Sequence, residues 1–337
     1  MSLQLAIVIL NWNGKKYLSK FLPSLLMSCS KDTRVIIADN NSSDGTISYL
    51  KENFPTLTII EHNTNGGFSK GYNDALKQIE AEYYCLLNSD IEVTKNWIEP
   101  VIKMMDQDPD IAAVQPKILS YNQSEMFEYA GASGGFLDYL GYPFCRGRLF
   151  DHIEKDEHQY DDPIPVFWAT GAALFVRSKV YHQLGGLDED FFAHMEEIDF
   201  CWRVNNAGYK VMIQPQSVVY HVGGGTLPKN NAFKTYLNFR NNLFLLLKNL
   251  PTHRLFITFL IRFFLDQLAA FVFLSKGEIH NFKAVYKAMF HFLKGYLKMR
   301  KKRGNAPKSA YKLTFKKSIV YEHYLKGKKI FNGSELL

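Results

Sequence analysis

Cysteine is scarce in this chain of 337 residues, which contains only four. They lie far apart, at Cys29, Cys85, Cys145 and Cys201. No pair has the spacing of a metal site, and the pattern does not resemble the disulfide framework of a small secreted protein. We therefore expect a reducing, cytosolic environment.

Two other signals are missing near the N-terminus. The opening stretch lacks the basic region of a secretory signal peptide and begins at once with a strand-like pattern, "MSLQLAIVILNWNG". The first apolar run is not followed by G-x-G-x-x-G, so a dinucleotide-binding fold is disfavoured. We expect neither a cleaved leader nor a nicotinamide or flavin site.

Acidic residues are few in the C-terminal quarter of the chain. Residues 251–337 contain 18 Lys and Arg but only 4 Asp and Glu, whereas residues 1–250 contain 22 and 29. The overall charge of +7 thus combines an acidic body of −7 with a basic tail of +14. Such a tail is typical of proteins that meet an anionic membrane surface or nucleic acid. Because 47% of the residues are hydrophobic, the body has enough apolar residues for a large core.

Short apolar runs alternate with helix-like segments in the first part of the chain. Strands are predicted at 5–10, 34–38, 57–61 and in "YYCLLNSD", and a fifth is predicted from "IAAVQPKIL". Helical patterns separate them. This alternation predicts an α/β fold with a doubly wound, mostly parallel sheet.

Polar, flexible residues follow four of these strands. They are Asn11, Asp39, the segment 65–67 and Asp90. Ligands of such sheets bind at the carboxyl ends of the strands, where these residues are expected to converge. Each alone is more often a turn residue, but together they favour a binding site.

A second polar cluster lies in the later half, in "HMEEIDFCWR". Glu196, Glu197 and Asp199 crowd together beside the aromatic residues Phe200 and Trp202. One interpretation is a solvated acidic helix start that the helix dipole favours. The other is a carboxylate held partly desolvated so that it can act as a base. The charge pattern alone leaves both open.

Seven stretches, taken together, carry a family resemblance. In order they are "VILNWNG", "IIADNNSSDGT", "NTNGGFSKGYNDAL", "LLNSD", "WATGAALFVRS", "LGGLDEDFFAHMEEIDFCWR" and "GYK…VVYHVGGGT". They resemble the inverting family-2 glycosyltransferases of GT-A fold, and within them the rhamnosyltransferase-like group of bacterial surface polysaccharide synthesis. The resemblance covers roughly residues 3–245. It implies a glycosyltransferase domain over 1–245 and a helical C-terminal region over 246–337.

The resemblance implies a metal site. The triplet Asn88-Ser89-Asp90 is similar to the D-x-D motif of the family, with Asn88 in place of the first Asp and able to bond the ribose or sugar of the donor. Asp90 would bind a divalent cation, Mn²⁺ or Mg²⁺, which suits oxygen ligands. His221 resembles the histidine that completes the coordination.

The resemblance also implies a catalytic base. The acidic stretch is similar to the family motif E-D-x-D, whose second acidic position is Glu197 here, with Glu196 as the next candidate. Asp199 would orient its neighbours near the acceptor pocket or cap the helix.

The remaining implied contacts are to the nucleotide and the sugars. Residues assigned to the nucleotide are Asn11, Asp39, Gly67, Asn73 and Asn88. Trp168 and Gly171 would line the sugar and acceptor pocket, although packing explains Trp168 equally well. The donor implied is a UDP- or dTDP-linked sugar, with dTDP-rhamnose among the candidates. The acceptor implied is a hydroxyl of a glycan or of a polyprenyl-linked oligosaccharide.

The basic tail contains two long apolar segments. Residues 255–274 are nearly long enough to span a bilayer, but Arg262 and Asp266 interrupt them on one helical face. Residues 282–303 hold eight Lys and Arg, no acid and one apolar stripe, a pattern typical of an interfacial helix on an anionic leaflet. We expect a peripheral protein on the inner face of the plasma membrane. Packing of both helices on the catalytic domain or on another subunit is the alternative.

Three further hypotheses remain beside the glycosyltransferase. A non-catalytic sensor would bind the donor sugar without transferring it. A nucleotidyltransferase would need a Gly-rich basic loop after the first strand, of which "NWNGKKY" supplies only part. Nucleic-acid binding lacks any recognisable module, so no nucleic-acid partner is expected.

Overall fold

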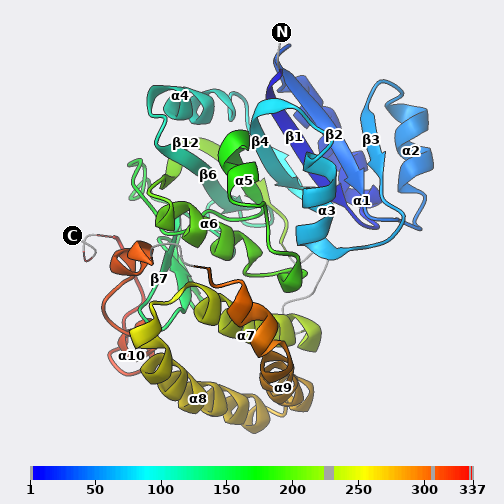
Figure 1. Cartoon of the computed structure of the whole chain (residues 1–337). Coiled ribbons are helices and arrows are strands. Elements are labelled where there is room, and N and C mark those ends of the chain that lie inside the picture. Colours follow the sequence, from blue (N-terminus) through cyan, green and yellow to red (C-terminus); the bar gives the residue numbers. More distant parts are fainter. Residues whose placement is uncertain (1–2, 224–230, 305–307, 334, 336–337) are drawn as a thin grey trace.

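The computed structural model describes residues 3–223, 231–304, 308–333 and 335. The end of the last family stretch, "GGT" at 224–226, lies outside these residues. The main sheet has eight strands in the order β3 (Thr58–Glu61), β2 (Thr33–Asp39), β1 (Leu3–Asn11), β4 (Ala81–Asn88), β11 (Ala173–Arg177), β6 (Ile111–Ser120), β12 (Lys210–His221) and β5 (Ile91–Val93) (Figure 1).

Most strands of this sheet are parallel, as predicted. β3, β2, β1 and β4 run in one direction, and β12 is parallel to β6. β11 is antiparallel to both β4 and β6, so β6 and β12 keep the direction of β4. The carboxyl ends of β1, β2, β4 and β12 therefore share one edge of the sheet.

Helices cover both faces of the sheet. On one face lie α1 (Lys15–Met27), α2 (Thr46–Asn53) and α4 (Glu99–Gln107), and on the other α3 (Gly67–Leu76), α5 (Ser178–Gln183) and α6 (Glu196–Asn206). Within β1, Ile7 contributes to the core under the first set of helices and Val8 to the core under the second. Burial on both faces is the reason why the strand is a continuous apolar run rather than an alternating one.

A small antiparallel sheet occupies part of the segment 121–175. It comprises β10 (His152–Ile153), β9 (Arg148–Leu149), β8 (Pro143–Cys145) and β7 (Gly135–Leu137). Its aromatic side chains Phe136 and Phe144 pack against Phe331 near the C-terminus. The end of the chain thus returns to the body.

The C-terminal region is helical, and Figure 1 shows its long helices gathered at one end of the molecule. It contains α7 (Ala232–Asn249), α8 (Thr252–Ser275), α9 (Ile279–Lys301) and α10 (Ile319–Tyr324). The predicted boundary between the two regions, at residue 245, falls inside α7. That helix packs on both α6 and α9.

Candidate functional site

Asn11 and Asp39 end two neighbouring strands and face each other in the register of β1 and β2. The amide Nδ2 of Asn11 donates to Asp39 Oδ1 at 2.9 Å, and the backbone amide of Ser42 donates to Asp39 Oδ2 at 2.8 Å. Asn11 Oδ1 is buried and has no hydrogen-bond partner in the protein. The two predicted nucleotide residues therefore lie together, with an acceptor still unused.

Gly67 begins α3 in a conformation that a side chain would strain. Its φ is +81°, and a Cβ there would lie 2.5 Å from the ring of Phe192. The next amide, that of Phe68, donates to Phe192 O at 2.7 Å. Gly67 thus permits the start of α3 to pack against the loop that precedes α6.

Asn73, the other predicted nucleotide residue on α3, is bonded to Tyr181 and to the segment before α6. Its Oδ1 accepts from Tyr181 Oη at 2.7 Å and from the amide of Leu187 at 3.0 Å. Its Nδ2 donates to Leu187 O at 2.8 Å. These bonds fix the segment before α6 and occupy both ends of the amide.

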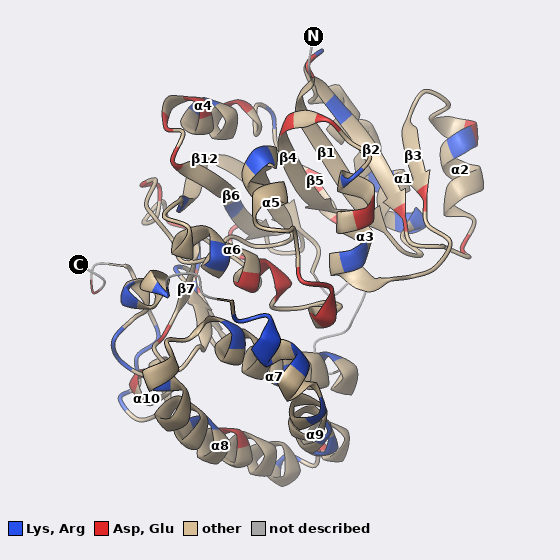
Figure 2. Cartoon of the chain, in the orientation of Figure 1, with Lys and Arg blue, Asp and Glu red and all other residues tan. Residues whose placement is uncertain are grey.

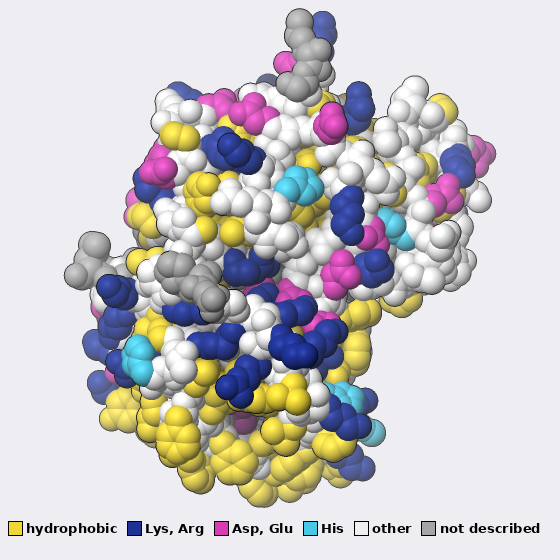
Figure 3. Space-filling view, in the orientation of Figure 1, with side chains coloured by type: hydrophobic (Ala, Val, Ile, Leu, Met, Phe, Trp, Pro, Cys, Tyr) yellow, Lys and Arg dark blue, Asp and Glu magenta, His cyan; other side chains and the backbone are white. Residues whose placement is uncertain are grey.

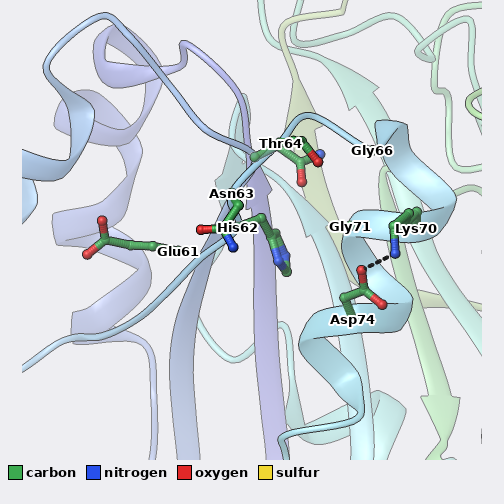
Figure 4. Close-up of a pocket in the computed structure, with 9 residues that line it drawn as sticks. Glu61, His62, Asn63, Thr64, Gly66, Lys70, Gly71 and Asp74 are labelled. Atoms are coloured by element: carbon green, nitrogen blue, oxygen red, sulfur yellow. Dashed lines mark hydrogen bonds and ion pairs between the residues drawn. The ribbon is translucent and has the colours of Figure 1, made fainter.

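A cavity of about 260 Å³ opens beside this edge, between the end of β3 and α3 (Figure 4). It borders the predicted nucleotide residues through Asn40 and Gly66. The ion pair of Lys70 and Asp74, with atoms 2.6 Å apart, lies on its wall. None of the predicted catalytic or metal-binding residues lines it.

The predicted metal ligands meet although 131 positions separate them. After β4 ends at Asn88, the chain turns through Ser89 and Asp90 into β5, which pairs with the end of β12 so that Ile91 faces His221. His221 Nε2 lies 3.2 Å from Asp90 Oδ1, and both side chains are buried. Asn88 lies two residues before Asp90 in the sequence, at the first position of the D-x-D pattern.

A third residue of this site, Glu128, was missed by sequence reasoning. Its Oε2 lies 3.5 Å from His221 Nδ1 and accepts from the amide of Ala130 at 2.5 Å. Burial lowers the pKa of His221, but the carboxylates of Asp90 and Glu128 outweigh it and raise that pKa to about 10. Glu128 stands in an irregular segment with no motif, so only the fold reveals it.

This arrangement suits a cation that takes only some of its ligands from the protein. Among the described residues, no group of three or more His, Cys, Asp and Glu side chains is placed to hold a metal ion. Asp90 offers a carboxylate oxygen, and His221 offers a nitrogen once its imidazole gives up the proton that Asp90 and Glu128 favour. Mg²⁺ and similar ions commonly take their remaining ligands from substrate phosphates and water.

Glu196 and Glu197 open α6 and differ in environment. Glu196 is only 4% exposed, and burial together with the charge of Glu197 raises its pKa well above the usual range. Glu197 is half-buried, and burial raises its pKa to about 7 although backbone amides at the helix start oppose the shift. The Oε2 atoms of both have no hydrogen-bond partner in the protein. With a pKa of about 7, Glu197 can therefore exchange a proton near neutral pH.

Of the two predicted pocket residues, only Gly171 lies beside Glu197. A Cβ at Gly171 would lie 3.7 Å from the Cβ of Glu197 and 3.2 Å from the ring of Phe68. Trp168 is only 4% exposed, and its Nε1 donates to Phe136 O at 2.9 Å. Of the two roles considered for Trp168, the structure favours packing.

Asp199 is fully buried in a network of cations and amides. Its Oδ2 lies 2.9 Å from Arg203 Nε and 2.8 Å from Lys248 Nζ, and its Oδ1 accepts from Asn249 Nδ2 at 2.8 Å. Burial would raise its pKa, but Lys248 and Arg203 hold it well below the usual range. This position agrees with an orienting role and joins α6 to α7.

The loop before Glu196 is strained and is held by α7. Phe192, His194 and Met195 all have positive φ, between 66 and 73°. The Nδ2 of Asn241 donates to the carbonyls of Phe191, Ala193 and His194 at 2.9, 2.8 and 2.7 Å. Arg240 Nε fixes the amide by donating to Asn241 Oδ1 at 2.9 Å.

Charges reinforce the same loop. Lys248 and Lys302 both bind Asp188, and Lys298 binds Asp190. Figure 2 shows acidic stretches of ribbon near α6 next to basic stretches among the C-terminal helices. No motif marked Arg240, Asn241 or the lysines, because their role depends on contacts with residues about fifty or more positions away.

Comparison with known proteins places the chain in a family. Residues 6–178 match the model of glycosyl transferase family 2. The N-acetylglucosaminyl-diphospho-decaprenol L-rhamnosyltransferase of Mycobacterium tuberculosis is 25% identical over 235 residues, which make up 64% of this chain and 75% of the relative.

Solved structures agree on the fold. GalNAc-T7 with UDP, GalNAc and Mn²⁺ aligns with a TM-score of 0.57 and 14% identity, over 73% of this chain and 48% of that one. Residues 1–349 of S. aureus TarS align with a TM-score of 0.52 and 16% identity, over 96% and 92% of the two chains. Together with the matched family model, which spans half of the sequence, these likenesses establish a GT-A fold. The chain belongs to glycosyl transferase family 2.

Proposed function

We propose that this glycosyltransferase moves a sugar from a nucleoside diphosphate sugar to an acceptor hydroxyl with inversion, and that Glu197 is its base. The observation that carries the proposal is the state of this carboxylate. It is half-buried beside Gly171, one of its oxygens is unpartnered, and burial raises its pKa to about 7. A base with a pKa near the working pH is the most effective in proton transfer.

The reaction is a single displacement. Glu197 takes the proton of the acceptor hydroxyl while the acceptor oxygen forms a bond to the anomeric carbon. The bond between that carbon and the diphosphate oxygen breaks, and the diphosphate leaves from the opposite face with the electron pair. Glu196 is more deeply buried than Glu197, so it is the poorer candidate to reach the acceptor.

The uracil or thymine of the donor nucleotide would bind at the ends of β1 and β2. Uracil and thymine present an N3–H donor, for which the Asp39 carboxylate and the unpartnered Oδ1 of Asn11 are suitable acceptors. Both UDP- and dTDP-linked sugars fit this pair of acceptors. The likeness to a rhamnosyltransferase supports dTDP-rhamnose as the first donor to test.

Asp90 and His221 would hold Mn²⁺ or Mg²⁺ together with the donor. When bound, such a cation neutralises the negative charge that develops on the leaving diphosphate. Glu128 would fix the imidazole so that Nε2 faces the cation. With Asn88 at the first D-x-D position, the protein supplies one carboxylate fewer than the motif usually provides.

The acceptor is proposed to be a glycan or a polyprenyl-linked oligosaccharide at the inner face of the plasma membrane. One support is the mycobacterial relative, an N-acetylglucosaminyl-diphospho-decaprenol L-rhamnosyltransferase. The basic helical tail of the present chain is the second support.

Two isosteric variants test the base. Glu197→Gln removes the proton acceptor, so we expect loss of transfer with unchanged donor binding. Glu196→Gln changes a buried carboxyl group whose pKa is raised well above the usual range, so we expect most activity to remain. Transfer of radiolabelled sugar and donor titration by calorimetry would measure both. The opposite result would assign the base to Glu196, and full activity of both variants would refute the mechanism.

A third variant tests the metal ligand, and the unaltered protein tests the non-catalytic alternative. Asp90→Ala should weaken donor binding in the presence of Mn²⁺ but not the metal-independent part of it. If the unaltered protein binds donors and never transfers or hydrolyses them, the non-catalytic sensor is the correct description instead.

A further inference from the structure

Helix α8 presents its polar side chains to the protein and its apolar side chains to the outside. The side chains buried on this helix are Thr258, Arg262, Asp266 and Ala270, which recur every four residues. In a soluble protein a surface helix shows the opposite arrangement. The inversion indicates that the outer face of α8 meets an apolar medium.

The buried charges of α8 are paired with the catalytic body. Arg262 Nη1 donates to Leu140 O at 3.0 Å, and its Nη2 lies 3.2 Å from Asp266 Oδ1. Arg262 also bonds the side chain of Asn242 and lies 4.2 Å from the ring centre of Tyr142. The pair that interrupted the apolar run in the sequence is therefore satisfied by the protein.

These contacts decide between two orientations. Among the described residues, α8 is the one helix that is long and apolar enough to cross a bilayer. A crossing helix would have to give up the partners of Arg262 and place two charged groups in hydrocarbon, which is strongly unfavourable. A helix that lies along the membrane surface keeps all of them.

The outer face of α8 is unusually apolar for a surface. Nine of its large hydrophobic side chains are more than two-fifths exposed, with Phe256 at 81% and Phe264 at 64%. The nine are Phe256, Ile257, Leu260, Phe263, Phe264, Leu268, Phe271, Val272 and Leu274. Figure 3 shows hydrophobic side chains gathered at this end of the molecule, over the long C-terminal helices.

Helix α9 extends the same surface and adds a basic border. Its exposed apolar side chains Tyr286, Phe290, Leu293 and Leu297 follow helical spacing, while Val285 packs inward. Exposed lysines stand next to this stripe, at Lys283, Lys287, Lys294 and Lys298. No acidic residue occurs between 279 and 301.

We propose that this face of α8 and α9, the α8–α9 face, lies in the plane of an anionic bilayer with its apolar side chains below the headgroups. Lysines beside an apolar stripe match such a surface, because their stems reach over apolar groups while their charges meet the lipid phosphates. A second copy of the chain is a poorer occupant, since it would bring the same lysines against them.

The surface would also place the catalytic loop close to the membrane. Lys298 of α9 and Lys302, directly after α9, bind Asp190 and Asp188, a few residues before Glu197. A lipid-linked acceptor held in the same bilayer would then reach the base from the side of the C-terminal helices. This last step rests on the proposed function, whereas the membrane surface itself rests on exposure and charge alone.

Flotation with vesicles tests the surface without using activity. The full chain should float with phosphatidylglycerol vesicles, float less with phosphatidylcholine vesicles and lose much of its binding at high salt. Phe263→Ser with Phe264→Ser should weaken binding about tenfold or more, since two large apolar groups no longer enter the bilayer. Met27→Ser, which changes an 82% exposed side chain on α1, should leave binding unchanged.

Charge and orientation need separate measurements. Lys283→Gln with Lys294→Gln should weaken binding to anionic vesicles only, whereas the same change at the exposed Lys31 and Lys103 should have little effect. Phe264→Trp should be quenched by lipids brominated near the headgroup. Quenching strongest at the bilayer centre would refute the in-plane orientation. Failure of the folded protein to float, or a dimer that buries Phe264, would overturn the proposal.

Discussion

We predict that Asn241→Ala slows transfer by displacing Glu197, although Asn241 does not belong to the base itself. The substitution removes all three hydrogen bonds to the loop before α6. The carbonyl of Phe191 keeps a bond from Arg240 at 3.0 Å, but those of Ala193 and His194 lose the bond that Asn241 gave them. Leaving buried acceptors unsatisfied costs about 1–3 kcal/mol of folding free energy.

Because the loop is strained, the substitution should affect the position of the start of α6 more than the stability of the whole protein. His194 and Met195 have positive φ, which costs about 1–3 kcal/mol per residue and persists only where the surroundings hold it. Once released, these residues would let the start of α6 shift. Because a shift of about 1 Å in a catalytic group costs on the order of 100-fold in rate, we expect kcat to fall about 10- to 100-fold.

Asn242→Ala is the matched control. Asn242 is the next residue on α7, is also buried, donates to Gly141 O at 2.7 Å and accepts from Arg262, and neither partner belongs to the loop before α6. Both variants should lose comparable stability in thermal unfolding and keep donor binding in calorimetry. Only Asn241→Ala should lower kcat.

The pH profile supplies a readout that lost stability alone would not move. The titratable groups around Glu197 are Glu196, Asp199 and Cys201, and none of them is bonded to Asn241. If the loop opens to water, the pKa of Glu197 falls from about 7 toward its usual value, and the acidic limb moves to lower pH. Equal effects of the two variants on kcat would refute this reasoning. So would a reduced kcat of Asn241→Ala whose pH profile keeps its acidic limb at the same pH.

Three further predictions concern the site. Only the ionised form of Glu197 accepts a proton, and its pKa is about 7. The rate under subsaturating substrate should therefore fall about tenfold for each pH unit below that value. A flat profile from about pH 5 to 8 would exclude Glu197 as the base. Glu128→Gln should weaken Mn²⁺ binding in the presence of donor about 10- to 100-fold, as followed by electron paramagnetic resonance of free Mn²⁺, while Glu125→Gln on the same segment should not. Gly171→Ala should lower transfer without affecting donor binding, because the added Cβ would lie 3.2 Å from the Phe68 ring. Unchanged acceptor kinetics would show that Gly171 does not border the acceptor.

The fold was predictable where burial leaves a pattern in the sequence. Strands such as β1 and β2 lie in the core with helices on both faces, so they are apolar runs that end in polar turns. The antiparallel direction of β11 and the small sheet β7–β10 left no such signal. A strand of two to five residues has the same composition in either direction, and its pairing depends on distant partners.

The site was predictable to a different degree for each residue. Asp90 and His221 came together as the motifs implied, because the turn into β5 brings them to the end of β12. Residue type could not tell that Trp168 donates its indole N–H to Phe136 O, or that Asn73 uses its amide on Leu187. Nor could it identify Asn241, whose partners lie about 50 positions earlier.

The position of α7 limits how tails can be exchanged between related enzymes. One helix carries Asn241, which holds the catalytic loop, and Lys248 and Asn249, which hold Asp199. A chimera joined at residue 245 would take these contacts from two different parents. A junction at Leu250 and Pro251, where α7 ends and α8 begins, would keep the α7 contacts together, but Lys298 and Lys302, which bind Asp190 and Asp188, would have to be retained in the exchanged tail.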